Sequence, residues 1–123
     1  MTTYIGRRGH MGAVVDWQTE GGTLGGLPSR LDLARHSPTG FEWGYGGSGP
    51  AQLALALLAD ATGDEAWSLA HYQNFKWKIV ADLPREWQMS QREVLNWVEW
   101  AKKQDEREAP APTLPGLNIH REH

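Results

Sequence analysis

Apolar residues in the second half of the chain recur at helical spacing in three separate stretches. The first, Ala51 to Ala61, is apolar on nearly every side, which is typical of a helix buried in a core. The other two each carry one apolar stripe, at the following positions: Leu69, Tyr72, Phe75, Ile79 and Leu83, then Val94, Trp97, Val98 and Ala101. We therefore predict helices at Ala51 to Ala61, Glu65 to Asp82 and Gln91 to Gln104, with the first in the centre.

Capping residues mark the ends of these helices. Backbone N–H groups in the first turn of a helix have no partner within the helix, so Pro50, which lacks an N–H, is well suited to that position. Gly49 is acceptable as the N-cap. Gly63 fits a left-handed C-terminal cap, and Asp64 is the N-cap expected for the second helix. Ser90-Gln91-Arg92-Glu93 is a capping box. The side chains expected in the core are Leu53, Leu57, Phe75, Ile79 and Val98.

Short β-type segments occupy the first half. Tyr4 to Arg8 and Ala13 to Trp17 flank a glycine-containing turn and predict a β-hairpin. Residues 21–28 favour a turn or loop, and Arg30 to Leu33 fits either a third short strand or a helical turn. The sequence predicts an α+β fold with a small antiparallel sheet from the N-terminal half packed against three C-terminal helices.

Composition points to one domain in a reducing, aqueous compartment. The 123 residues include no cysteine and carry a formal net charge of -3 without blocks of one sign, so neither a disulfide framework nor a strongly basic nucleic-acid footprint is present. No apolar run is long enough for a membrane span. We expect a cytoplasmic domain over residues 1–104 and a flexible tail over residues 105–123, where prolines and charges replace the apolar pattern.

Aromatic residues are the compositional anomaly. The chain has seven tryptophans, which either fill a small core or include one or two exposed anchors for a partner. Phe41, Trp43 and Tyr45 alternate along one segment, so an extended backbone would place them on one face.

The string SPTGFEWGYGGSGPAQLALA, residues 37–56, resembles the hallmark of a small family of unknown function from bacteria, archaea and their viruses. Arg30 to Leu33, Tyr72 to Lys76 and Leu83-Pro84 resemble the family as well, so the similarity covers about Tyr4 to Trp97. The resemblance implies no established reaction. It implies a genomic setting, because many members appear in phages and mobile elements.

Gly44 to Gly49 matches Gly-x-Gly-x-x-Gly directly before a helix, where free backbone N–H groups can hold a phosphate. A dinucleotide fold also needs a second parallel strand after the helix, and a Walker loop needs a following Lys-Ser or Lys-Thr pair. The sequence shows neither. The glycines therefore indicate either a structural loop beside the central helix or a simpler phosphate site, with Trp43 or Tyr45 stacking on a base and Arg7, Arg8 and Arg35 in support.

Catalytic and metal chemistry have weaker support. His36, Ser37, Glu42 and Arg35 lie close in sequence without a spacing typical of acid–base or nucleophilic catalysis. His120 and His123 form a pair with no third zinc ligand. We expect no cofactor and no metal, and His71 partly exposed or hydrogen-bonded.

These observations favour a non-catalytic binding protein of a phage or mobile element that acts on a larger host protein or ribonucleoprotein complex, as an anti-CRISPR type inhibitor or other anti-defence protein does. The alternatives are a nucleotide or single-stranded nucleic-acid binder and a small hydrolase or transferase. The candidate binding residues are Arg35, His36, Phe41, Glu42, Trp43, Tyr45, Gly46, Gly47 and Ser48.

Overall fold

A computed structural model describes residues 1–10 and 12–108. Four antiparallel strands form one sheet in the order β3-β2-β1-β4. Their bounds are β1 Thr3–Gly9, β2 Gly12–Gln18, β3 Leu24–Gly26 and β4 Trp87–Ser90. The helices are α1 Ser48–Thr62, α2 Glu65–Lys78, a short 3-10 helix η1 Val80–Asp82, and α3 Gln91–Glu108. The predicted α+β class, with an antiparallel sheet and three main helices, is confirmed.

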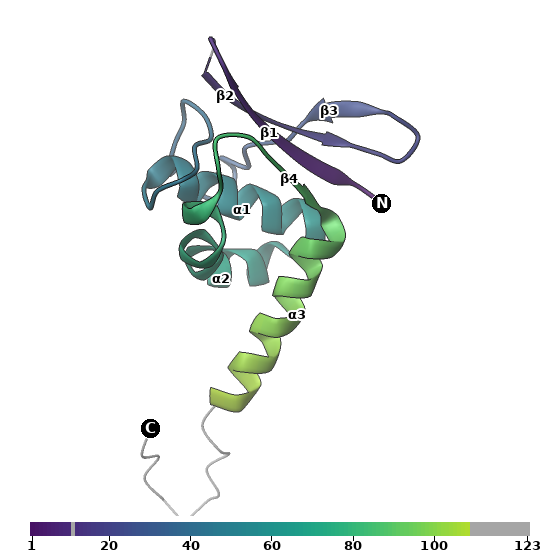
Figure 1. Ribbon diagram of the computed structural model, residues 1–123. Coiled ribbons are helices and arrows are strands. Elements are labelled where there is room, and N and C mark those ends of the chain that lie inside the picture. Colours follow the sequence, from purple (N-terminus) through teal and green to yellow (C-terminus); the bar gives the residue numbers. More distant parts are fainter. Residues whose placement is uncertain (11, 109–123) are drawn as a thin grey trace, which may run out of the picture.

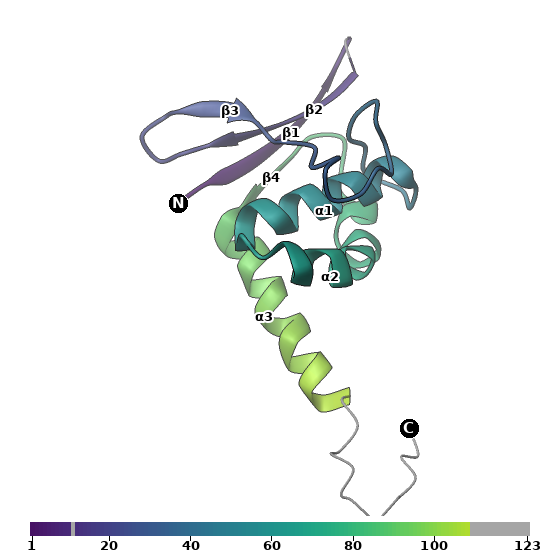
Figure 2. The ribbon, with the colours of Figure 1, turned by 180° about the vertical axis from the view of Figure 1, so that it is seen from behind.

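The molecule is layered, with the sheet against one side of α1 and α2 against the other (Figure 1). The view from behind shows the same order, and α3 runs from the end of β4 past both helices (Figure 2). Twelve of the fifteen residues of α1 are buried, because the helix is enclosed on both sides. Its predicted central position is confirmed.

Tyr4 ties the sheet to α1. Its ring is fully buried, and its hydroxyl donates to Asp60 Oδ2 at 2.7 Å. Burial, helped by this hydrogen bond and the carboxylate charge, raises the pKa of the Tyr4 hydroxyl.

Glycine faces tryptophan at two positions in the sheet. Gly6 pairs with Trp87 across β1 and β4, and a Cβ on Gly6 would lie 2.2 Å from the Trp87 indole. Gly25 pairs with Trp17 across β2 and β3, where the corresponding separation would be 2.3 Å. Each indole thus covers a strand glycine that has no side chain to pack.

The helix termini largely follow their local signals. Gly63 has φ 68° as the C-cap of α1, Asp64 accepts from the Trp67 N–H at 3.0 Å, and Ser90 and Glu93 exchange the two bonds of a capping box. The start of α1 differs from the prediction, because Gly47 and not Gly49 is the N-cap. Pro50 then lies further into the first turn, where its missing N–H is still harmless.

The last two helices also end elsewhere than predicted. The helix expected to reach Asp82 stops at Lys78 and passes into η1. The helix expected to end at Gln104 continues to Glu108. The remainder of the predicted flexible tail, residues 109–123, lies outside the described residues.

Four of the five expected core residues are buried: Leu53, Leu57, Phe75 and Val98. Ile79 is only half-buried, because it follows the end of α2 and its neighbour Val80 enters the core instead. Leu69, placed on the buried stripe by its spacing, is 40% exposed, and Ser68 takes the inward position.

Two strands were not predicted. Leu24–Gly26 was expected to be a loop, but it pairs with Asp16 to Gln18 of β2. No element was predicted for Trp87 to Met89, but Trp87–Ser90 pairs with Thr3 to Gly6 of β1. Both strands are short, and each forms because a neighbouring strand offers unpaired backbone groups.

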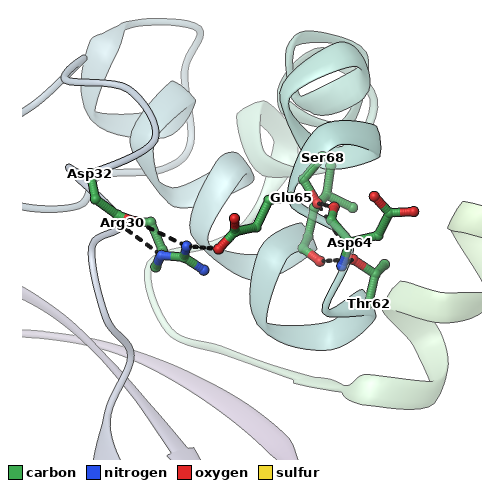
Figure 3. A network of polar contacts seen from close by, with 7 residues as sticks. Arg30, Asp32, Thr62, Asp64, Glu65 and Ser68 are labelled. Carbon is green, nitrogen blue, oxygen red and sulfur yellow. Dashed lines mark hydrogen bonds and ion pairs between the residues drawn. The ribbon is translucent and has the colours of Figure 1, made fainter.

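Arg30 to Leu33 is a turn and not a strand, closed by the Leu33 N–H donating to the Arg30 carbonyl at 3.0 Å. The Arg30 guanidinium contacts Asp32 and also Glu65 at the start of α2 (Figure 3). These bonds raise the pKa of Arg30, and Arg30 lowers the pKa of Asp32. The turn is thereby joined to α2 close to the Thr62, Asp64 and Ser68 contacts at the α1–α2 junction.

Gln52 of α1 holds the segment of residues 29–37, which includes this turn, against the core. Its side chain is fully buried. The amide nitrogen donates to the carbonyls of Ser29 at 2.6 Å and Ala34 at 3.0 Å. The amide oxygen accepts from the N–H groups of His36 at 2.8 Å and Ser37 at 3.1 Å. Both lone pairs and both N–H bonds of the carboxamide are used, so the group is fully satisfied inside the protein.

No helix in the described part of the chain combines the length and apolar character needed to cross a membrane.

Replacing Leu57 with alanine should lower the free energy of unfolding by about 2 to 5 kcal/mol, through lost burial and a residual cavity. Leu69→Ala makes the same change at an exposed position and should cost no more than about 0.5 kcal/mol. Urea titration of both variants measures the difference. A loss below about 1 kcal/mol at Leu57 would contradict its place in the core.

Gln52→Leu should destabilise the protein by more than about 3 kcal/mol, because each buried backbone group left without a partner costs about 1 to 3 kcal/mol. Gln73→Leu, on the exposed side of α2, is the matched control and should be nearly neutral. Chemical denaturation gives the stabilities, and hydrogen exchange reports the backbone amides of residues 36 and 37. Equal stability of the two variants would show that the carboxamide does not hold the segment.

Candidate functional site

The glycine-rich loop, residues 44–49, leaves the core at Trp43 and leads into α1. The Trp43 ring is 3% exposed, packs edge-on against Trp87 with 5.6 Å between ring centroids, and donates from Nε1 to the Arg85 carbonyl at 3.1 Å. Gly44 has φ 88°, and its N–H donates to the Val80 carbonyl at 3.0 Å. The chain therefore turns sharply directly after Trp43.

This turn separates the aromatic residues that were expected to share one face. Trp43 is buried and Phe41 half-buried, whereas Tyr45 is 52% exposed. The prediction of a common aromatic face is wrong, because the positive φ at Gly44 breaks the extended geometry on which the alternation depends. Of the three rings, only Tyr45 is available to a partner.

Trp77 of α2 is a further surface residue of the site that the sequence did not single out. Its ring lies on Gly46, where a Cβ would come within 2.1 Å of the indole, and the Tyr45 ring lies on Gly47, where the separation would be 2.6 Å. Trp77 is 59% exposed. Tyr45, Gly46, Gly47 and Trp77 together are called the aromatic platform below. The only sequence signal for Trp77 was its position off the apolar stripe of the helix.

Gly46 and Gly47 are needed for this close approach. Neither has a positive φ, and Gly47 has φ -139°, which any residue adopts. Their backbone conformation therefore does not require glycine. The two rings occupy the space that a β-carbon would require.

Lys76, beside Trp77, is also part of the site and was not predicted. It is 8% exposed, and its ammonium lies 4.3 Å from the centroid of the Trp77 ring. Within residues 1–10 and 12–108 it makes no ion pair with a carboxylate. A largely buried lysine with only an aromatic face as its partner leaves most of its charge uncompensated.

The N-terminus of α1 also lacks an acidic residue within the helix itself. No side chain caps it, and its first turn contains no acidic residue. The N–H groups of Ser48 and Gly49 precede the first intrahelical bond, which runs from the Ala51 N–H to the Gly47 carbonyl at 3.0 Å. The positive end of the helix dipole therefore lies at the glycine-rich loop without a capping side chain.

Glu42 serves a structural contact. Its carboxylate pairs with Arg8 Nη1 at 2.8 Å, and the Arg8 guanidinium lies 4.7 Å from the centroid of the Trp43 ring. A Cβ on Gly49 would lie 2.6 Å from the Glu42 β-carbon, so this glycine allows the segment to pass α1. Arg7 is paired with Asp16. Both β1 arginines expected to support a nucleic-acid site thus have carboxylate partners.

His36 and Ser37 are fixed by Gln52 through their backbones. The His36 ring also bonds to the Tyr72 hydroxyl, with 5.1 Å between the ring centroids. Ser37 and Glu42 line a shallow hollow of about 210 Å³. His36 is not among its lining residues, and Arg35 is an exposed side chain.

Potential metal ligands do not gather in the described residues, where no three His, Cys, Asp or Glu side chains converge. His71 is half-buried and hydrogen-bonded, to the Trp67 carbonyl at 2.9 Å and to Asp105 at 2.6 Å, as expected from its position. The histidine pair at His120 and His123 lies outside the described residues.

Comparison with known proteins places the chain in a family. Neither the curated proteins nor the solved structures contain a significant match to the chain. The model of a family of unknown function, DUF6166, matches residues 4–100, which include the sheet except Thr3 of β1, the glycine-rich loop, α1 and α2. The chain therefore belongs to this family of unknown function.

Proposed function

We propose that the protein is a non-catalytic binding domain whose contact surface is the aromatic platform. The observation that carries the proposal is the exposure of the Tyr45 and Trp77 rings, each lying on a glycine of one loop. Large aromatic side chains are enriched at the energetic centres of protein interfaces. A ring already packed on the backbone loses little conformational freedom when a partner covers it, so more of the contact energy remains for binding.

The contacts of the polar residues considered for catalysis support a non-catalytic binding domain. The backbone N–H groups of His36 and Ser37 bond to Gln52, and the Glu42 carboxylate pairs with Arg8, so these three residues take part in contacts that hold the fold together. A hydrolase or transferase would need a nucleophile and a base within hydrogen-bond reach of one another. Among the described contacts, Ser37 has no base beside its hydroxyl, and the His36 ring bonds instead to the Tyr72 hydroxyl.

As the partner we propose a larger protein or ribonucleoprotein complex of the host, with the protein acting in the cytoplasm for a phage or mobile element. Within this class we favour an anti-defence role, of the anti-CRISPR type. The support for this step is the sequence resemblance and the genomic setting it implies, together with a single small domain that presents an aromatic contact surface.

Tyr45→Ala and Trp77→Ala should each weaken binding of the host partner by about 2 kcal/mol or more, as expected for an aromatic hot spot. The partner is first captured from host extract with the unaltered protein and identified by mass spectrometry. Calorimetry with the purified partner then measures the affinity of each folded variant.

Leu24→Ala is the control, because Leu24 is 55% exposed and lies on β3, away from the loop (Figure 1). It should leave the affinity unchanged. If the platform is only structural, Tyr45→Ala will lower the melting temperature while the affinity per folded molecule stays the same, and the proposed contact surface is then rejected.

A further inference from the structure

We propose that the aromatic platform is a docking site for a polyproline II segment, and that its occupant is residues 110–115 of the same molecule, called the proline segment below. The inference rests on the proposed function, because it implies that the proline segment and the host partner compete for one surface. It gives a role to a part of the chain that lies outside the described residues.

The proline segment reads Pro-Ala-Pro-Thr-Leu-Pro and holds three of the seven prolines of the chain. It begins two residues after α3 ends at Glu108, as expected because proline cannot continue a helix. A sequence this rich in proline favours polyproline II, an extended helix with three residues per turn and no internal hydrogen bonds. In that conformation Pro112 and Pro115 lie one turn apart on the same side.

The aromatic platform presents two rings to such a segment. Tyr45 is 52% exposed and Trp77 is 59% exposed. The two rings lie on Gly47 and Gly46, which are neighbours in one loop. Domains that recognise polyproline II segments do so with surfaces lined by aromatic side chains. Two prolines on one side of the segment therefore match two exposed rings on one loop.

The hydrogen-bonding groups of the platform and the proline segment are complementary. Within residues 1–10 and 12–108, neither the Tyr45 hydroxyl nor Trp77 Nε1 has a hydrogen-bond partner. The Lys76 ammonium, 4.3 Å from the centroid of the Trp77 ring, is a third donor. Each proline offers a carbonyl acceptor and no N–H donor. A surface rich in donors thus suits a segment rich in acceptors.

The proline segment can cover the rings at little electrostatic cost. None of its six side chains is charged, and Leu114 adds an apolar side chain between two prolines. No charge therefore has to be removed from water when the segment packs on Tyr45 and Trp77. Its conformation is already restricted by proline, so docking costs less conformational entropy than for an ordinary segment.

The chain beyond α3 is long enough to reach the platform of its own molecule. Asp105, three residues before the end of α3, contacts His71 of α2 at 2.6 Å. Trp77 is six residues further along α2, about 9 Å in an α-helix. Residues 109–115 span about 20 Å in polyproline II. This length exceeds the separation along α2, so it also allows the chain to fold back after α3.

Docking within one molecule is favoured over docking on a second copy. A short tether keeps the effective concentration of the proline segment near the millimolar range. A second copy matches this only when the protein itself is about that concentrated. The bound segment would lower the apparent affinity of the host partner, in proportion to the fraction of molecules whose platform is free.

The test places a spin label beside the proline segment in the full chain. The chain has no cysteine, so Asn118→Cys provides a single site for the label, three residues past Pro115. Nuclear magnetic resonance then reports which groups the label approaches. We expect broadening of the Gly46 and Gly47 amide signals and of the Trp77 indole signal. Signals of β3, away from the loop (Figure 1), should stay sharp. Sharp signals from the loop and from Trp77 would overturn the inference.

Pro112→Ala combined with Pro115→Ala is the matched control, because it keeps the chain length and the label while removing the two prolines on one side. It should reduce the broadening of the loop amide signals at least about threefold, since alanine does not fix the extended backbone and brings an N–H donor. Unchanged broadening in this variant would show that the tether alone brings the label near the loop, and would overturn the inference.

The platform itself is tested in the same labelled chain. Trp77→Ala should sharpen the loop amide signals, because half of the ring surface is lost. Tyr45→Ala should do the same for the Trp77 indole signal, and it keeps the test open should Trp77→Ala fail to fold. Broadening as strong as in the unaltered platform in every folded variant would overturn the docking site.

A mixture of two samples separates one molecule from two. Spin-labelled chain without isotope is mixed with isotope-labelled chain that carries no spin label. Sharp loop signals in this mixture support docking within one molecule. Broadening in the mixture as strong as in the labelled chain itself would assign the contact to a second copy and overturn the proposal.

Affinity for the host partner separates this inference from the proposed function. The double proline variant should bind the partner at least about threefold more tightly, because its platform is free more of the time. If Tyr45→Ala loses the partner but the label broadens no platform signal, the proposed function stands and the docking falls. If the label broadens the platform signals but no platform variant affects the partner, the docking stands and the proposed contact surface falls.

Discussion

The carboxamide of Gln52 is the interaction on which the arrangement around α1 depends. Residues 29–37 have no strand or helix of their own, and four hydrogen bonds to this one buried side chain fix them against the core. The same segment reaches α2 twice, through Arg30 with Glu65 and through His36 with Tyr72. A single glutamine thus positions the segment that joins the sheet to the helical layers.

Close packing of aromatic rings on glycine is the second recurring feature. Gly6 with Trp87 and Gly25 with Trp17 use it inside the sheet, and the glycine-rich loop uses it with Trp77 and Tyr45. The same packing of a ring on a glycine leaves the ring differently exposed in the two places. Within the sheet the indoles cover strand glycines, whereas at the loop the rings remain exposed. This difference is why we place the binding surface at the loop.

Signals that act within a few residues could be read from the sequence. Gly63, Asp64 and the Ser90–Glu93 capping box end or begin helices through neighbouring backbone groups, and the structure has them as expected. The hairpin and the fully apolar central helix were equally predictable, because one depends on a local turn and the other on burial from all sides. The fold class follows from these elements.

Long-range contacts decided the rest. β3 and β4 are too short to be recognised alone and exist because β2 and β1 offer unpaired edges. The sequence indicated the glycine-rich loop and Tyr45 as candidates, but only the turn at Gly44 buries Trp43 and exposes Tyr45. Lys76 and Trp77 become part of the site because α2 packs beside the start of α1, thirty residues away in sequence. Amino-acid order determined the local elements, and tertiary packing determined which side chains meet at the surface.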